Sequence, residues 1–395
     1  MSGVPKLSRR GRWAVPVGAL VVTGAVMAGS LMSGAQAAPS LPARTPAQLL
    51  AAVGQDQGPA LYGSVLETAS LGLPSLPGNS SNPTSITSLL TGSHTVNVWY
   101  ASPERYRLAL PASLSETDVI RNGSTVWLWQ STANAVTEIS VPADKAKYKP
   151  TPMTTPALTP QQAANQVLAA VGPTTAVSVD SNVVVAGQAA YELVVAPKDA
   201  RSLVGQIRIA VDGHNGVPLR VQVFARGASN PAISVGFTSV TFATPAPADT
   251  SFTPPADAKI TKENPGQEPK PGGQPNETGI TTIGSGWLAV LDLPSSALTA
   301  GSAGPRPGPP NVPMNGASGE SAAALRALIG SATVEHGAWG TGRLLRTSLI
   351  SVLITDSGST FVGAVQPSVL YAAALKAATG SATATGSATA SRPAS

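Results

Sequence analysis

Short segments in which apolar and polar residues alternate fill most of the chain between residues 61 and 242. Alternation with a period of two is typical of β-strands that bury one face. The breaks between the segments are short and carry turn residues such as Asn122-Gly123, so neighbouring strands are expected to run antiparallel. The predicted strands are 61–68, 93–100, 105–110, 117–121, 125–130, 135–141, 175–179, 182–185, 189–196, 205–211, 217–225 and 232–242. Together they predict one large, curved antiparallel sheet.

Two helices are predicted at the start and in the middle of this region, over 46–53 and 160–171. Each follows a threonine, Thr45 or Thr159, that can cap the helix with its hydroxyl group. Proline then occupies the first helical position, and glutamine follows three residues after the cap. The sequence therefore predicts an α+β fold that is mainly β, in which helices cover one face of the sheet.

The N-terminus is typical of an export signal. Four basic residues precede an apolar run over 13–32, and Ala35-Gln36-Ala37 then forms a small-x-small cleavage site. We predict a signal peptide over 1–37 and an extracytoplasmic protein, secreted or associated with the cell envelope. The run is also close to the length of a membrane helix, so a retained N-terminal anchor is the alternative. Arg9-Arg10 leaves both the twin-arginine and the general export route open.

The charge and the cysteine content exclude several classes of protein. Removing residues 1–37 takes away four positive charges and no negative ones, so the net charge falls from +5 to +1. No basic cluster remains that could bind nucleic acid. The chain has no cysteine, which excludes disulfides and a lipid-attachment cysteine. We expect a monomer.

The composition changes after residue 254, where Pro, Gly, Lys and Glu become frequent. We predict that the sheet domain ends there and that a disordered linker leads to a small C-terminal α/β unit. Within this unit we expect helices over 320–329 and 367–378 and a hairpin within 340–365. The predicted divisions are the sheet domain over 38–254, the linker over 255–285, the C-terminal unit over 286–378 with a Gly/Pro loop over 300–319, and a disordered tail over 379–395.

No set of catalytic residues is visible. The three histidines, His94, His214 and His336, are far apart in the sequence and lack the close spacing of metal ligands. The chain also has no nucleophile elbow, phosphate loop or dinucleotide-binding motif. We therefore expect no metal, no cofactor and no enzymatic activity.

The most distinctive chemistry is a cluster of tryptophans on predicted strands. Only 4% of the residues are aromatic, yet Trp99, Trp127 and Trp129 lie close together in the sequence. Trp127 and Trp129 share one face of their strand, because side chains alternate along it. These large side chains could fill a core or form the wall of a ligand cavity. Alanine-rich covering helices would leave room for such a cavity.

Two stretches of the first half resemble the bacterial lipoprotein-localisation carriers, the LolA family. The stretches are Val98-Trp99-Tyr100-Ala101-Ser102-Pro103-Glu104-Arg105-Tyr106-Arg107 and Asn122-Gly123-Ser124-Thr125-Val126-Trp127-Leu128-Trp129. In the second half, Gly187-Gln188-Ala189-Ala190-Tyr191-Glu192-Leu193 and the segment from Asp212 to Pro218-Leu219-Arg220 are similar to larger relatives typified by the periplasmic sigma-factor regulator RseB/MucB. The resemblance covers about residues 44 to 254.

This resemblance implies an open half-barrel whose concave face is covered by helices and encloses an apolar cavity for acyl chains. It implies a carrier of lipids or lipoproteins, as in outer-membrane lipoprotein sorting. The alternative is a sensor that binds a membrane-bound regulator such as an anti-sigma factor, with 286–378 as its docking module. The resemblance favours the cavity wall over the core for the aromatic cluster. The candidate lipid-binding residues are Trp99, Tyr106, Leu108, Trp127 and Trp129.

Overall fold

The computed structural model describes residues 40–54, 58–72, 91–112, 114–141, 159–169, 172–263, 281–294 and 330–387. The predicted signal peptide, the loop over 300–319 and the predicted helix over 320–329 lie outside these residues. No helix within the described ranges is both long and apolar enough to cross a membrane.

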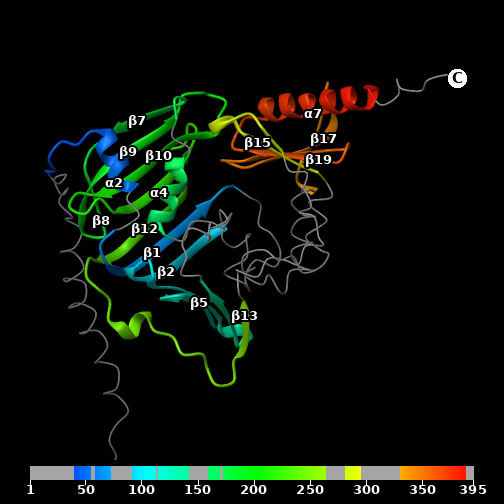
Figure 1. The fold of residues 1–395 in the computed structure, drawn as a ribbon. Helices are drawn as coiled ribbons and strands as arrows, with labels where there is room; N and C mark the ends of the chain where they lie inside the picture. Colours follow the sequence, from blue (N-terminus) through cyan, green and yellow to red (C-terminus); the bar gives the residue numbers. More distant parts are fainter. Residues whose placement is uncertain are drawn as a thin grey trace, which may run out of the picture. The chain divides into compact units, whose positions relative to one another are not determined.

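Within the described residues, thirteen strands form one large sheet that is curved and open (Figure 1). Its order is β13-β6-β5-β4-β3-β2-β1-β12-β11-β10-β9-β7, and β8 pairs with β9. The strands are β1 Leu61–Ser70, β2 Thr91–Ser102, β3 Arg105–Ala112, β4 Ser115–Asn122, β5 Thr125–Gln130, β6 Ala135–Ser140, β7 Thr175–Val179, β8 Val183–Val185, β9 Gln188–Pro197, β10 Val204–Asp212, β11 Pro218–Ala225, β12 Pro231–Thr241 and β13 Lys259–Glu263. The predicted sheet is thus confirmed, and the predicted strands from 61 to 242 are all present.

The turn between β4 and β5 shows why these segments pair as neighbours. Asn122 and Thr125 are the last pair of the ladder, and Gly123 takes a φ of 64° between them. Glycine adopts this left-handed conformation without the steric cost that a side chain brings. A short 3-10 helix, η1 over Ser131–Ala133, joins β5 to β6.

The two predicted helices are α2 over Pro46–Val53 and α4 over Pro160–Ala169. Leu49 and Val53 of α2 and Ala164 of α4 are buried in one core cluster with Leu193 of β9 and Ile209 of β10. We call the face of the sheet on which both helices pack the inner face and the opposite face the outer face. The expectation that helices cover one face of the sheet is confirmed.

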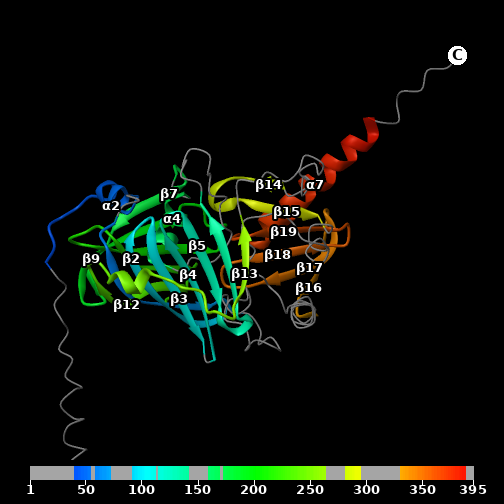
Figure 2. The same ribbon diagram turned by 60° about the horizontal axis from the view of Figure 1, so that its bottom comes forward.

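The C-terminal part forms a second sheet, with the order β14-β15-β19-β18-β17-β16, and a helix, α7 (Figure 2). Phe361 and Leu353 of this sheet are buried against Leu370 of α7, and Trp339 stacks on Tyr371 with 5.5 Å between the ring centroids. The elements are β14 Thr281–Ile283, η3 Gly286–Leu288, β15 Val290–Pro294, β16 Thr333–Gly337, β17 Gly340–Arg346, β18 Ser351–Thr355, β19 Ser359–Gly363 and α7 Pro367–Ser387. The predicted hairpin within 340–365 is three strands, because a turn over 347–350 separates β17 from β18.

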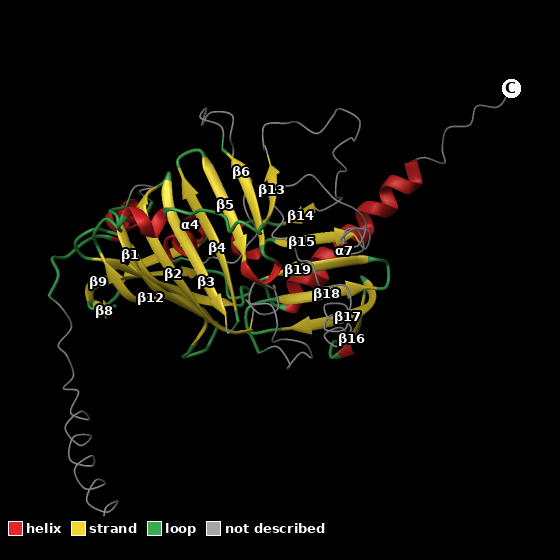
Figure 3. Ribbon diagram, turned by 90° about the horizontal axis from the view of Figure 1, so that it is seen from below, coloured by secondary structure: helices red, strands yellow, loops and turns green. Residues whose placement is uncertain are grey.

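The linker prediction over 255–285 is wrong at two places. β13 lies inside this range and runs parallel to β6, which makes the large sheet mixed rather than purely antiparallel (Figure 3). β14 lies at the end of the range and pairs with β15. The tail prediction is wrong in part as well, since α7 continues to Ser387.

Backbone hydrogen bonds join the C-terminal sheet to the large sheet. Leu203 N donates to Ala364 O at 2.9 Å, and Gln366 N donates to Arg201 O at 2.8 Å. Leu349, in the turn before β18, is buried in the core cluster that contains α2 and α4. The turn between β17 and β18 therefore contributes Leu349 to the core of the large sheet, while the C-terminal sheet and α7 form a cluster of their own.

Candidate functional site

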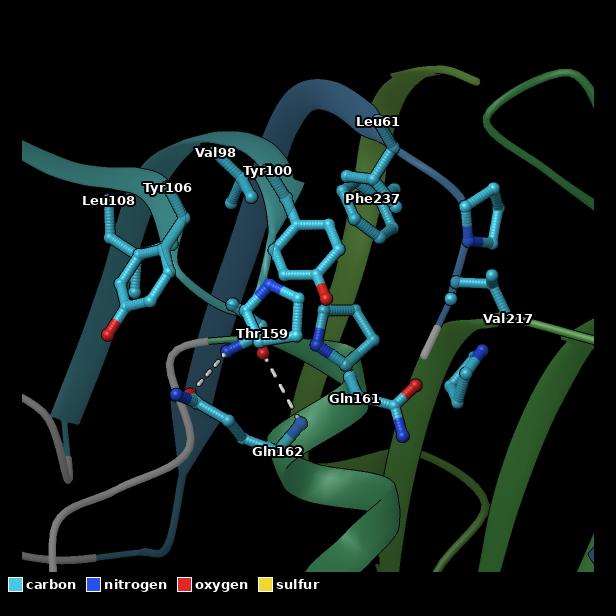
Figure 4. Close-up of a pocket in the computed structure, with 15 residues that line it drawn as sticks. Leu61, Val98, Tyr100, Tyr106, Leu108, Thr159, Gln161, Gln162, Val217 and Phe237 are labelled. Atoms are coloured by element: carbon cyan, nitrogen blue, oxygen red, sulfur yellow. Dashed lines mark hydrogen bonds between the residues drawn. The ribbon is translucent and has the colours of Figure 1, made fainter. Parts of the chain in front are cut away.

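A cavity of about 360 Å³ lies between the inner face of the large sheet and the first turn of α4 (Figure 4). This volume is within the range of small-molecule sites. The lining residues come from the segment before β1, from β1 to β3 and the turn between β2 and β3, from β11 and β12, and from α4. They are Gly58, Pro59, Leu61, Val98, Tyr100, Pro103, Tyr106, Leu108, Thr159, Pro160, Gln161, Gln162, Val217, Pro218 and Phe237.

The pairing of β2 with β3 sets one wall of the cavity. Val98 lies opposite Leu108, and Tyr100 lies opposite Tyr106. Directly paired residues share a face of the sheet, and residues two apart on a strand do so as well. All four side chains therefore point into the same space.

The cavity is apolar inside and polar near α4. Leu61, Val98 and Phe237 are buried in its wall, and they belong to one hydrophobic cluster. Among the described residues that line it, the polar groups are the two tyrosine hydroxyls, Thr159 and two glutamine amides, and none of these residues is charged. Figure 4 shows Tyr100 extending from the sheet toward Thr159 and Gln161. This arrangement suits an apolar body that carries an uncharged polar group.

The first turn of α4 is held in place by its own cap. Gln162 N donates to Thr159 Oγ1 at 3.3 Å, and Thr159 N donates to Gln162 Oε1 at 3.1 Å. Gln161 Nε2 donates to Val53 O of α2 at 3.0 Å. The cap that the sequence predicts for this helix thus also fixes the part of the helix that lines the cavity.

Two of the five candidate residues, Tyr106 and Leu108, line the cavity, and the other three do not. Trp99 lies between Val98 and Tyr100 on β2, so its side chain points to the outer face. The ladder pairs Trp99 with Arg107, Arg107 with Ile120, and Ile120 with Trp127, which places all four side chains on that outer face. Trp99, Trp127 and Trp129 therefore do not line this cavity, and their role in lipid binding stays a prediction.

The tryptophans are half-buried beside a smaller core on the outer face, in which Ile120 and Asp118 are buried. The chain after β12 forms a short helix, η2 over Pro247–Thr250, which contacts β2, β3 and β4. Phe252 then packs against Trp127 and Trp129, with ring centroids 6.1 and 6.2 Å apart. The segment over 245–254, which we call the strap, covers the aromatic cluster that the sequence singled out.

The outer core encloses an ion pair. Arg107 Nη2 donates to Asp118 Oδ2 at 2.5 Å and to Glu116 Oε1 at 3.2 Å, and its guanidinium lies 5.5 Å from the centroid of the Trp99 ring. Only 1% of Asp118 is exposed. Burial, followed by the neighbouring Glu116, raises the pKa of Asp118 to about 7, although Arg107 opposes both effects. Side chains alternate between the two faces of a strand, so Arg107 and Asp118 lie on the face of the sheet opposite to the cavity. We assign this ion pair a structural role.

A second buried carboxyl group lies on the inner face, where Glu67 of β1 is paired with His94 of β2. Burial raises the pKa of Glu67, and His94 lowers it to a smaller extent. Neither residue lines the cavity. Within the described ranges, His, Cys, Asp and Glu nowhere form a group of three that could hold a metal ion.

Sequence reasoning missed Tyr100, Phe237, Val217 and the first turn of α4 as parts of the cavity. Tyr100 could have been found, because it is paired with Tyr106 across the tight turn that joins β2 to β3. Phe237 and Val217 could not, since their place in the wall depends on the pairing of β1 with β12, far away in the sequence.

No family model matches the sequence, and no curated protein matches it. Among solved structures, the complex of MucA and MucB from Pseudomonas aeruginosa is 14% identical with a TM-score of 0.38, and the match covers 83% of this chain and 95% of that chain. An uncharacterised conserved protein from Thermus thermophilus is 11% identical with a TM-score of 0.31, over 55% of this chain and 98% of that one. A LolA superfamily protein from Nitrosomonas europaea is 11% identical with a TM-score of 0.21, over 53% and 99%. The structural neighbours of this chain thus include MucB and a LolA superfamily protein, each with a TM-score below 0.5.

Proposed function

We propose that this protein is an exported, non-enzymatic carrier that holds the apolar part of a lipid or lipoprotein in the cavity between the inner face and α4. The carrier role is the one that the sequence resemblance implies. The predicted signal peptide would bring the protein to the compartment where such cargo is handed between membranes.

The observation that carries this proposal is the chemistry of the cavity. Its interior is formed by buried apolar side chains such as Leu61, Val98 and Phe237, while its polar groups are uncharged and lie toward α4. Burial of apolar ligand surface contributes roughly 25 cal/mol per Å², so such a space favours an apolar ligand over water. General acid–base catalysis most often uses His, Asp, Glu or Lys, and none of these residue types is among the described residues that line the cavity.

Filling the cavity is expected to abolish binding. In Leu108→Trp the larger side chain would occupy the space beside Tyr106, and we expect the Kd for a dansylated fatty acid, measured by fluorescence, to rise at least about tenfold. Trp127→Ala, on the outer face, serves as the control and should bind within about twofold of the unchanged protein. Circular dichroism verifies that both variants are folded. Equal loss of binding in both variants, or no loss in Leu108→Trp, would contradict the proposal.

A second candidate function is a sensor that passes the state of the cavity to the C-terminal sheet. The observation that favours it is the position of α4, whose Gln161 lines the cavity while Ala164 and Val167 share a core cluster with Leu349 of the C-terminal part. The partner would be a membrane-bound regulator that the C-terminal sheet recognises. If hydrogen exchange over 348–366 is the same with and without the dansylated fatty acid, this candidate loses its support.

A further inference from the structure

The cavity wall contains an unusual share of side chains that cannot change shape. Four of its lining residues are prolines: Pro59, Pro103, Pro160 and Pro218. The proline ring fixes φ, and the side chain has almost no conformational freedom to lose on burial. These residues can neither move aside for a ligand nor close in behind it.

Two of these prolines lie in segments that hydrogen bonds hold rigid. Pro160 is the first residue of α4, between the reciprocal cap bonds of Thr159 and Gln162. Pro218 follows the turn after β10, in which Asp212 Oδ1 accepts from His214 N at 2.9 Å and from Asn215 N at 2.6 Å. A side-chain oxygen that accepts two backbone N–H groups fixes such a turn.

The turn that carries Pro103 is held in the same manner. Glu104 N donates to Ser102 Oγ at 3.3 Å, and Gly123 N of the neighbouring turn donates to Glu104 O at 2.8 Å. The turn between β2 and β3 is therefore bonded to the turn between β4 and β5. Three of the four prolines, Pro103, Pro160 and Pro218, thus lie in segments whose backbone is fixed by hydrogen bonds.

Three further side chains of the wall are planar rings, beside the more flexible Leu61, Leu108, Gln161 and Gln162. Tyr100 and Tyr106 are directly paired across β2 and β3, and Phe237 of β12 is buried in the same cluster. An aromatic ring offers a large contact area with only two rotatable side-chain bonds. Proteins that accept many flexible ligands use methionine-rich surfaces that repack, whereas none of the described residues that line this cavity is methionine.

A wall that contains many prolines and aromatic rings is expected to bind rigid ligands more tightly than flexible ones. A flexible chain loses rotational freedom in each bond that the cavity immobilises, and a fused ring of the same size has little such freedom to lose. Because the prolines and the aromatic rings of the wall adapt little to the many shapes of a chain, a ligand that is already rigid gains more from contact with them. The uncharged lining also favours a ligand whose bound part is uncharged, because a buried charge without a partner is strongly unfavourable.

We propose that the cavity selects a rigid, ring-bearing, uncharged apolar group over a flexible straight chain. This inference rests on the proposed function, and it narrows the cargo to lipids whose apolar part carries a ring system.

Two alcohols with ten carbons each provide the test, namely bicyclic decahydronaphthol and straight-chain decanol, titrated separately into the full-length protein by calorimetry. They carry one hydroxyl group each, so they differ mainly in stiffness. We expect the bicyclic alcohol to bind about tenfold more tightly. Equal affinities, or tighter binding of decanol, would overturn the inference while leaving the cavity as a ligand site. Binding of neither alcohol would overturn both the inference and the proposed function.

A matched variant tests the cause of the preference. Tyr106→Met replaces a planar ring by a flexible chain at the half-buried edge of the cavity, where the fold should tolerate the change. We expect the ratio of the two affinities to fall at least about threefold, mainly through tighter binding of decanol. An unchanged ratio in a folded Tyr106→Met variant would show that the rigid wall is not the reason for the preference.

Discussion

Replacing Ile120 by alanine is expected to lower the free energy of unfolding by about 3 kcal/mol and to leave ligand binding unchanged. Ile120 is completely buried on the outer face, between Arg107 on one neighbouring strand and Trp127 on the other. The substitution removes buried methylene and methyl groups and leaves an empty space where the Ile120 side chain was. The sheet on one side and the strap on the other prevent the neighbouring residues from filling this space. Chemical denaturation measures the loss of stability, and the dansylated fatty acid measures binding.

The control for this prediction is Ile260→Ala on β13. Ile260 is 49% exposed, so the same kind of truncation should cost less than about 1 kcal/mol. If Ile120→Ala proved as mild as Ile260→Ala, the outer face would lack the core that we describe. If it weakened binding in a protein that is still folded, the ligand would have to contact the outer face.

Stability is expected to fall, by an amount on the order of a few kcal/mol, as the pH rises from about 4 to about 8 because of Asp118. Burial and Glu116 raise the pKa of Asp118 in the folded protein to about 7, while an unfolded chain has the ordinary value near 3.8. The folded state therefore binds this proton more tightly than the unfolded state. The resulting stabilisation is complete below the unfolded pKa and is lost as the pH rises through the folded pKa.

Asp118→Asn should remove this part of the pH dependence, because the amide group resembles the protonated acid and does not titrate. Denaturation series across this pH range should show a flatter profile for Asp118→Asn and an unchanged one for Glu138→Gln, whose carboxylate pairs with the exposed Lys262 at 3.4 Å. A slope of the same size in Asp118→Asn would assign the pH dependence to another group.

The elements that could be predicted well are those fixed by nearby residues. α2 begins and ends where the sequence places it, because Thr45 and Gln48 satisfy the free N–H groups of the first turn within four residues of chain. The strands from β1 to β12 follow from alternation, and Asn122-Gly123 joins β4 to β5 as expected. Such signals are local, so a single sequence contains them in full.

The faces of the strands could not be predicted as reliably. Alternation shows that Trp127 and Trp129 lie together, but it does not show which face α4 covers. The register of β2 with β3 adds that Trp99 pairs with Arg107, so it cannot share a face with Tyr106. Large aromatic side chains suit both a cavity wall and a packed surface, so the sequence does not show that Phe252 of the strap packs on Trp127 and Trp129.

The strap and β13 could not be predicted because residues distant in the sequence hold them, through aromatic contacts of Phe252 for the strap and through polar contacts for β13. Lys259 N donates to Asn134 O at 2.8 Å, and Asn134 Nδ2 donates to Asp257 Oδ2 at 3.0 Å. Lys259 and Ile260 are exposed, so β13 lacks the apolar alternation that marks a strand. Its composition of Lys, Thr and Glu is typical of linkers and also of protected edge strands.

Photolabelling tests most directly whether the ligand lies on the inner face. A fatty acid that carries a diazirine near the end of its chain would be bound to the full-length protein and activated by light, and the labelled residues would be mapped by mass spectrometry. We predict labels on Val98, Tyr100, Leu108 or Phe237. Labels confined to Trp127, Trp129 and Phe252 would contradict the assignment of the cavity as the ligand site.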